Sequence, residues 1–251
     1  MLQVVSAVSG ETILSLEAAG FQSMSVRDLK KSLELQTGCS RFCQKLLRDH
    51  SPLADDDPLS PLTDETLHLL LMQFLPPDEK DAELMSACRI CPPEMVEAIL
   101  RQPRDPNVIS KGRTALHYVA RGKYSGPNCR LLLEAWADAN TRADDGNTPL
   151  HDAAALGNLE VAHILLKSGA DKDASTASGL TPLHAAAKAG SLDVLRLLVD
   201  SGANHKAVTD SGQTPLHQAS VLGREKCAHF CWTARLTLKR RRLLVGGLYI
   251  W

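Results

Sequence analysis

The hydrophobic pattern over residues 145–169 predicts two short helices in succession. In DGNTPLHDAAALGN, Thr148 can cap a helix through its hydroxyl, and Pro149 suits the first helical position. Gly157 then ends this helix, because a left-handed backbone costs glycine little. The next stretch, LEVAHILLKSGAD, places a broad apolar stripe along a second helix that Gly169 closes. A turn-rich segment follows.

This pattern recurs along the chain. SGLTPLHAAAKAGS begins at residue 178, SGQTPLHQASVLGR at residue 211, and a weaker copy, KGRTALHYVARGKY, at residue 111. The histidine returns at steps of 34, 33 and 33, and the glycine five residues before it keeps the same steps. A catalytic residue has no need of four evenly spaced copies, whereas a unit that buries its face against an identical neighbour does. We therefore interpret four histidines as structural: His117, His151, His184 and His217.

The segments TPLHDAA, LLKSGADKD, TPLHAAA and LLVDSGANHK resemble the ankyrin repeat, which has a 33-residue period and a T-P-L-H-x-A signature. The resemblance covers residues 112–232. It implies an all-α ankyrin-repeat solenoid, and it implies that the signature histidines brace neighbouring repeats through hydrogen bonds. Protein partners are expected to bind the concave surface formed by the turn fingers and the first helices.

The first repeat departs from the pattern. It has Ala115 where proline is expected, Trp136 where later repeats have glycine, and one extra residue in RGKYSGPN. We therefore expect residues 122–128 to be looser than the rest. The preceding ELMSACRICPPEMVEAILRQPRDPN keeps the period without the signature, which is typical of a capping repeat.

The C-terminal end also departs from the pattern. After residue 232 the chain has one Lys and four Arg with no acidic residue, a charge of +5. Its apolar end, LLVGGLYIW, is too short to span a bilayer. We interpret this tail as a disordered or aberrant terminus. The alternative is a nuclear-import or acidic-surface patch at Lys239-Arg240-Arg241-Arg242.

The first third lacks the 33-residue period. Residues 2–16 predict two short strands around Ser9-Gly10, VRDLKKSLEL predicts an amphipathic helix closed by Gly38, and TLHLLLMQF predicts a buried strand. This order predicts a small α+β roll. In its second half, SRFCQKLLRDHSPLADDDPLSPLTDETLHLLLMQF, the segment resembles a ubiquitin-like domain, the β-grasp fold.

That resemblance implies an apolar patch on the sheet for docking partners, at Leu47, His68 and Leu70. Conjugation requires a free Gly-Gly carboxylate after the last strand, but the chain continues through FLPPDEKDAE. We therefore expect a built-in domain followed by a stiff proline linker. The expected domains are a ubiquitin-like domain at 1–75, a linker at 76–78, an ankyrin array at 79–232 and a tail at 233–251. Within the array we expect a cap at 79–110, repeats at 111–144, 145–177 and 178–210, and a degenerate repeat at 211–232.

The composition is that of a soluble globular chain. Of 251 residues, 44% are hydrophobic, 23% charged and only 4% aromatic, as expected for small Ala- and Leu-rich helices. No segment has the form of a signal peptide or of a membrane span, so we expect a cytoplasmic protein, with the nucleus as a second compartment. Residues 1–78 carry 6 Lys/Arg against 11 Asp/Glu, a net −5 that disfavours nonspecific nucleic-acid binding.

The seven cysteines suggest a metal or disulfide site. Cys88 and Cys91 have the spacing of a zinc half-site, but a second such pair at useful separation is missing. Without a signal peptide, disulfides are not expected. We therefore expect no metal and predict buried packing for most of the thiols, with a reactive thiol as the alternative. The residues expected to be buried are Cys39, Cys43, Cys88, Cys129 and Cys227.

No catalytic motif is present: no phosphate-binding loop, HExxH, GxSxG or kinase catalytic loop. The acidic runs at residues 55–57 and 144–145 are expected to be solvated turns. We expect a non-enzymatic, monomeric adaptor that binds one or more proteins and uses no cofactor or small-molecule substrate. The alternatives are a recognition or shuttle component of ubiquitin-dependent turnover, and a regulatory fragment of a longer enzyme. The candidate contacts are the side chains left over once the fold is satisfied: Tyr118, Arg121, Arg142, Asp144, Asp145, Asp152, Lys188, Lys206 and Gln218.

Overall fold

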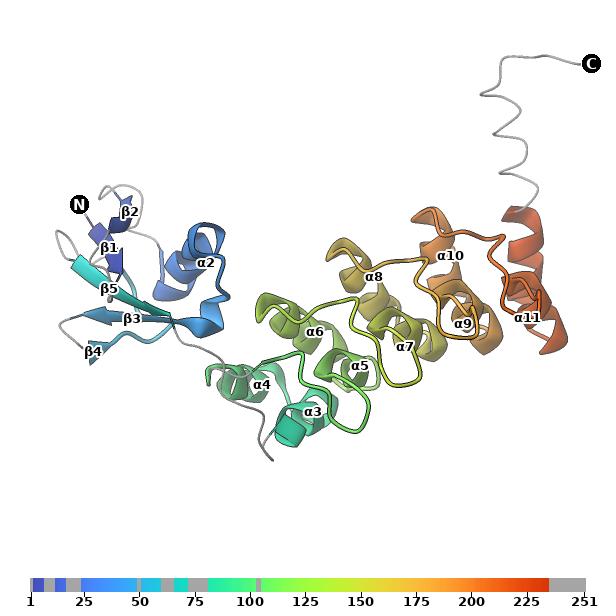
Figure 1. Cartoon of the computed structure of the whole chain (residues 1–251), viewed down its shortest axis with the longest axis horizontal. Coiled ribbons are helices and arrows are strands. Elements are labelled where there is room, and N and C mark those ends of the chain that lie inside the picture. Colours follow the sequence, from blue (N-terminus) through green and yellow to red (C-terminus); the bar gives the residue numbers. More distant parts are fainter. Residues whose placement is uncertain are drawn as a thin grey trace, which may run out of the picture. The chain divides into compact units, whose positions relative to one another are not determined.

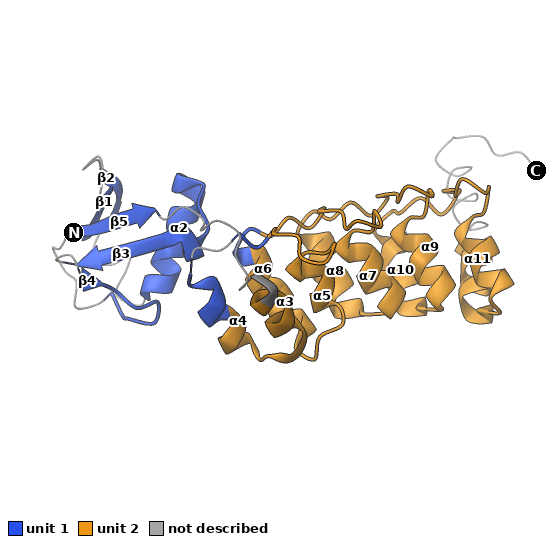
Figure 2. Cartoon of the chain, turned by 60° about the horizontal axis from the view of Figure 1, so that its bottom comes forward, with its two compact units in different colours: residues 1–79, 97–106, 134–136 blue, residues 80–96, 107–133, 137–251 orange. Residues whose placement is uncertain are grey.

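The computed structural model describes residues 2–6, 12–16, 24–48, 51–59, 66–71, 81–102 and 105–234 (Figure 1). The chain divides into two compact units (Figure 2). Unit 1 consists of Met1–Glu79, Glu97–Pro106 and Glu134–Trp136, and unit 2 of Lys80–Val96, Asn107–Leu133 and Ala137–Trp251. The predicted turn at Ser9-Gly10, the predicted linker at 76–78 and the tail from residue 235 onward lie outside the described residues.

Unit 1 contains a five-stranded mixed sheet in the order β2-β1-β5-β3-β4. The strands are β1 (Leu2–Ser6), β2 (Thr12–Leu16), β3 (Gln44–Arg48), β4 (Ser51–Pro52) and β5 (Thr66–Leu71). Strand β1 pairs antiparallel with β2 and parallel with β5, while β3 pairs antiparallel with β5 and β4. This mixed sheet is compatible with the predicted β-grasp.

One face of the sheet is buried. In β5, Leu67 and Leu69 are buried, but the residues between and beside them are half-buried or exposed. The predicted buried strand is therefore buried on one face only. Side chains alternate across a strand, and only one face of this sheet meets the core.

Helix α2 (Val26–Thr37) covers the buried face. Ser25 begins it with a capping box, because its hydroxyl accepts the backbone N–H of Asp28 while Asp28 accepts the N–H of Ser25. Gly38 ends it with φ 65°, a left-handed conformation that glycine adopts cheaply. Leu29 and Leu33 lie in one cluster with the buried leucines of the strands.

For Asp55, the expectation that the acidic run at residues 55–57 is a solvated turn was wrong. It is buried rather than solvated, and it accepts a 2.6 Å hydrogen bond from Lys30 Nζ. The guanidinium of Arg41, which follows α2 in the short 3-10 helix η1 (Arg41–Cys43), lies 3.3 Å from the same carboxylate. A buried charge is tolerable only when it is paired, so Asp55 is a structural ion.

Unit 2 is built from consecutive helix pairs. The helices are α3 (Asp81–Ile90), α4 (Pro93–Leu100), α5 (Ala115–Val119), α6 (Ser125–Glu134), α7 (Pro149–Leu156), α8 (Leu159–Lys167), α9 (Pro182–Ala189), α10 (Leu192–Asp200) and α11 (Pro215–Val221). The last four residues of α4 and the last residue of α6 are assigned to unit 1. The first helices pack side by side, α3 on α5, α5 on α7, α7 on α9 and α9 on α11. Buried alanines such as Ala153 and Ala186 allow this close approach.

The irregular first repeat folds differently from the expectation. Helix α6 begins at Ser125, and Asn128 is fully buried, donating to the carbonyls of Cys88 and Cys91. Of the segment expected to be loose, 122–128, only residues 122–124 lie outside the helix. Trp136 has φ 68°, a left-handed conformation that is costly for a bulky residue.

The last repeat keeps its second helix. Residues 225–234 are helical although they lack the expected leucines. Cys227, Cys231 and Ala234 are buried at helical spacing and take the place of the leucines. Arg196 of α10 also lies over the ring of Phe230, 5.3 Å from its centroid. The helix thus runs two residues into the segment that was expected to be the tail.

Candidate functional site

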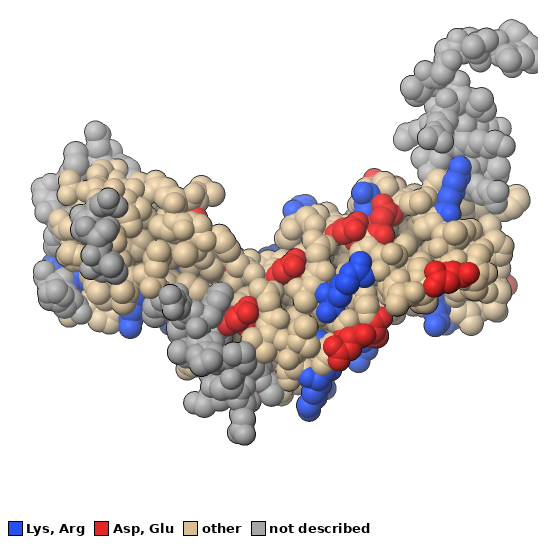
Figure 3. Space-filling model, viewed as in Figure 1, with Lys and Arg blue, Asp and Glu red and all other residues tan. Residues whose placement is uncertain are grey.

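The predicted contact residues lie on one face of unit 2. We call it the finger face: the turn segments 107–114, 137–148, 170–181 and 203–214 together with the first helices α5, α7, α9 and α11 and with Arg121, which follows α5. In the view of Figure 3, acidic and basic side chains are interspersed over the repeats rather than gathered by sign. Of the candidates, Arg121, Arg142, Asp144, Asp145, Lys188 and Lys206 are exposed, Tyr118 and Gln218 are half-buried, and Asp152 is buried.

Asp152 was wrongly expected to be free for a partner. It forms an ion pair with Arg113, whose guanidinium also pairs with Asp145. Arg113 belongs to the first repeat and both carboxylates to the second, so this cluster joins neighbouring repeats. Asp152 is a packing residue, and Asp145 is ion-paired although it is exposed.

Two further candidates are held by the fold. Arg142 donates from Nη1 to the carbonyls of Ser175, at 2.6 Å, and Gly146, at 3.3 Å. Gln218 bonds to the side chain of Gln213. Arg142 and Gln218 can contact a partner only through side-chain atoms that do not form these hydrogen bonds.

The remaining basic candidates are unpaired. Across the described residues, no carboxylate pairs with the side chains of Arg121, Lys188 or Lys206. Arg121 lies in the turn that follows α5, Lys188 lies in the last turn of α9, and Lys206 lies in the turn segment before α11. These three exposed cations are the positions most available for contact from outside.

The four signature histidines lie beneath this face. The Nδ1 atom of His151 accepts the backbone N–H of Thr148 at 3.1 Å, and its Nε2 lies 3.1 Å from the carbonyl oxygen of Leu180 in the next repeat. A carbonyl can only accept, so Nε2 carries the proton and the ring is neutral. His117 and His184 repeat this arrangement with Asn147 and Gln213.

His217 differs from the other three. It is exposed, and in the described part of the chain it bonds only to Thr214. The bracing bond to a following repeat is therefore missing at this position, which corrects the expected role of His217.

Burial lowers the pKa of His117, His151 and His184. Desolvation penalises the imidazolium, and the carbonyl hydrogen bonds only partly offset it. Protonation would also place a proton on Nδ1, where a backbone N–H already points. These rings are therefore fixed as neutral, which suits a structural brace and not a proton carrier.

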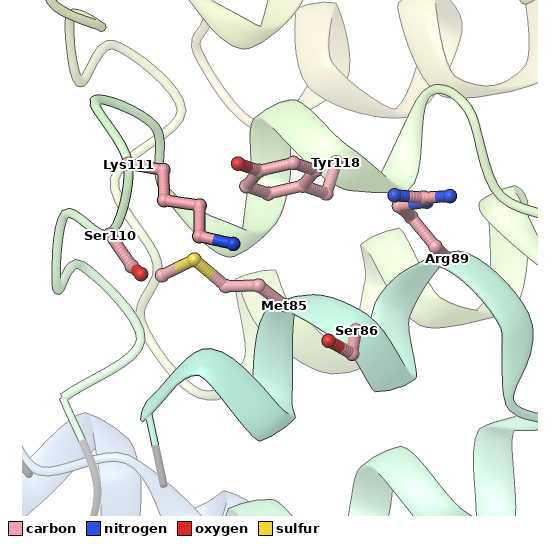
Figure 4. Close-up of a pocket in the computed structure, with 6 residues that line it drawn as sticks. All are labelled: Met85, Ser86, Arg89, Ser110, Lys111 and Tyr118. Carbon is pink, nitrogen blue, oxygen red and sulfur yellow. The ribbon is translucent and has the colours of Figure 1, made fainter. Parts of the chain in front are cut away.

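A pocket of about 150 Å³ opens at the N-terminal end of the finger face (Figure 4). Its lining comes from α3, the first finger turn and α5: Met85, Ser86, Arg89, Ser110, Lys111 and Tyr118. Only Tyr118 was expected from the sequence. The sequence did contain one signal for this pocket, Lys111. It directly precedes the finger glycine, at a position where the later repeats have aspartate or serine.

The patch predicted on unit 1 is brought together by the sheet register. Leu47 of β3 lies directly opposite His68 of β5, and Leu70 lies opposite Lys45. All three predicted residues are half-buried and point away from the core face.

The family model for ankyrin repeats (3 copies) matches residues 84–176 and 172–231, more than half of the chain. The chain belongs to the ankyrin-repeat family. No curated protein matches its sequence. Ankyrin repeats generally mediate protein–protein interaction and are typically non-enzymatic. None of the described helices is long and apolar enough to cross a membrane.

The cysteines of the ankyrin array lie within its packing. All seven are free thiols, and Cys43, Cys88, Cys129, Cys227 and Cys231 are buried. Cys39 is only half-buried, contrary to expectation. Burial raises the pKa of Cys88 and of Cys129 to about 12, so both remain protonated and unreactive at neutral pH. Within the described residues, no cluster of His, Cys, Asp and Glu could hold a metal ion.

Proposed function

We propose that this ankyrin-repeat protein is a non-enzymatic adaptor that binds a protein partner through its finger face. The observation that carries the proposal is the set of exposed, unpaired cations Arg121, Lys188 and Lys206. Beneath them, the signature histidines and the Arg113 ion cluster satisfy the fold without these three side chains. Charges that a fold does not use are free to select a partner and speed its association.

Affinity capture from a cell lysate tests this proposal. The double variant Arg121→Glu, Lys188→Glu should lose the captured proteins, because it reverses the charge of the face without touching a packed residue. The matched control is Lys167→Glu, Lys226→Glu, which makes the same charge change on the second helices, where both lysines are exposed. Equal capture by both double variants would refute a finger-face adaptor.

For unit 1 we propose a ubiquitin-like domain that supplies a second docking patch at Leu47, His68 and Leu70. The strand order and the covering helix α2 support the fold, and the adjacent half-buried side chains support the patch. An apolar patch of this kind binds partners by burying its area away from water.

The double variant Leu47→Ala, Leu70→Ala should lose a set of captured proteins that the finger-face variant retains. Leu35→Ala is the control, since Leu35 lies on α2 and is 92% exposed. Loss of proteasomal or ubiquitin-ligase subunits from the captured set would favour a role in protein turnover. An unchanged set would refute the patch.

A further inference from the structure

The pocket at the N-terminal end of the finger face is lined by two cations and an aromatic ring. In Figure 4, Lys111 reaches in from the finger turn and Arg89 rises from α3, on either side of the ring of Tyr118. Met85, which is buried, forms part of the floor. The pocket therefore combines positive charge with an apolar wall.

Neither cation is neutralised within the described part of the chain. No ion pair joins Arg89 or Lys111 to a carboxylate there. Asp145 of the neighbouring finger and Asp152 of α7 pair with Arg113. The carboxylate of Asp144 lies against Gly112, so close that an added Cβ on this glycine would meet its Oδ2 at 2.5 Å. It forms no ion pair with Lys111.

The backbone of Lys111 supplies a second, independent observation. Ser110 and Arg113 exchange backbone hydrogen bonds of 3.0 and 3.2 Å around a two-residue turn. Such a turn requires positive φ at both central residues, and here φ is 51° at Lys111 and 74° at Gly112. A lysine in this left-handed conformation is strained, and asparagine or glycine would largely avoid the strain. A costly residue retained at a pocket rim indicates that its side chain has a use.

We propose that this pocket binds one acidic side chain of a protein partner, a carboxylate or a phosphate. The inference rests on the proposed function of the finger face and specifies what the partner presents there. A volume of about 150 Å³ fits a single side-chain head group, whereas cofactor sites are several hundred Å³. The two cations recognise the anion, and Met85 and Tyr118 contact the carbon stem that carries it.

Titration of the ¹⁵N-labelled full-length chain with three capped hexapeptides tests this inference. The peptides are identical except for a central Glu, phosphoserine or Gln. We expect the Glu and phosphoserine peptides to shift the amide resonances of Lys111, Gly112 and Tyr118 with dissociation constants of about 1 mM, and the Gln peptide to leave them unchanged. Tenfold tighter binding of phosphoserine would assign the pocket to phosphorylated partners, and similar affinities would assign it to carboxylates.

The variant pair Lys111→Asn, Arg89→Gln should weaken acidic-peptide binding at least tenfold. It should remain folded, because asparagine suits the turn and Arg89 is exposed on its helix. Lys167→Gln, an exposed lysine on α8, is the control and should bind as wild type. Equal binding by the variant and the wild type, or no shift at about 10 mM peptide, would overturn the inference.

Affinity capture separates the two proposals. Capture that depends on Arg121 and Lys188 but not on Arg89 and Lys111 contradicts the pocket and leaves the adaptor standing. Capture that is unchanged by substitutions at all four residues contradicts the adaptor proposal itself.

Discussion

Three of the signature histidines each join one repeat to the next through a single hydrogen bond. His151 accepts from the cap of its own helix and donates to Leu180 of the following repeat. An alanine at this position would leave the buried N–H of Thr148 without a partner and would leave the carbonyl of Leu180 with only the backbone N–H of Thr176. A buried hydrogen-bonding group that loses its partner costs more free energy of folding than a formed hydrogen bond contributes. Substitutions at such positions therefore strongly affect the stability of an interface.

The variant His151→Ala should lose about 1 to 3 kcal/mol of unfolding free energy, measured by urea denaturation. Partner binding well below the melting temperature should barely change. His217→Ala is the matched control: it is exposed and lacks the second bond, so its loss should stay below about 1 kcal/mol. Unchanged stability of His151→Ala together with abolished binding would contradict the structural role.

The same histidines predict how stability depends on pH. Their folded-state pKa values are lowered, so the unfolded chain binds protons first as the pH falls. Stability is therefore complete above the unfolded pKa of about 6.5 and declines as the pH falls toward the lower folded values.

Urea midpoints measured from pH 8 to pH 5.5 should decline below about pH 6.5, with up to three protons taken up on unfolding. The variant His151→Gln keeps a donor and an acceptor but cannot titrate, so its decline should be shallower by one proton. Stability that rises as the pH falls through this range would contradict the buried neutral rings.

Residue-level prediction from the sequence succeeded where spacing carried the information. The 33-residue step identified the signature histidines, because a repeat must present the same face to each neighbour. It failed for Asp152 and Asp55, which resemble solvated acids in sequence. Their partners, Arg113, Lys30 and Arg41, come from other segments, and a single sequence without homologues does not reveal such pairings.

At the scale of elements, packing overrides local composition. The helix at residues 225–234 forms without leucines because Cys227, Cys231 and Ala234 fill the buried positions. Strand β5 is rich in leucine, yet one of its faces lies away from the core. Such cases could not be predicted from composition alone, because only the neighbouring elements decide which positions are covered.

The rate of amide hydrogen exchange in each repeat should depend on how completely that repeat is packed. Amides between Leu150 and Leu198 should exchange slowest, since α7 to α10 have buried leucines and packed neighbours on both sides. Residues 121–124, which lie outside the helices, should exchange faster, as should the terminal helix at 225–234. Exchange at 225–234 as slow as at Leu165 would contradict this ranking.

Deleting residues 235–251 should leave the central repeats folded with an unchanged melting temperature. Deleting all residues from Cys227 onward removes two buried thiols and should lower the melting temperature, because the packing interface of the last repeat is then lost. A melting temperature that falls equally for both truncations would contradict nearest-neighbour coupling.

At the scale of the whole molecule, the chain joins an ankyrin array to a small α+β unit. Each has its own buried cluster, and each leaves one face with side chains that its fold does not use. The 33-residue period predicted the ankyrin array, and the order of strands and helix predicted a small α+β unit. The pocket at Arg89 and Lys111 was not predicted, because it forms where a turn and a helix meet and no sequence motif marks that contact. The central claim is that the finger face makes the contacts with partners.

Site-specific photo-crosslinking in cells measures that contact directly. Benzoyl-phenylalanine would replace Lys188 or Lys206 on the finger face, or Lys167 or Lys226 on the second helices, one position at a time. We predict protein adducts from positions 188 and 206, and none above background from 167 and 226. Adducts confined to 167 and 226, or absent from all four positions, would contradict a finger-face adaptor.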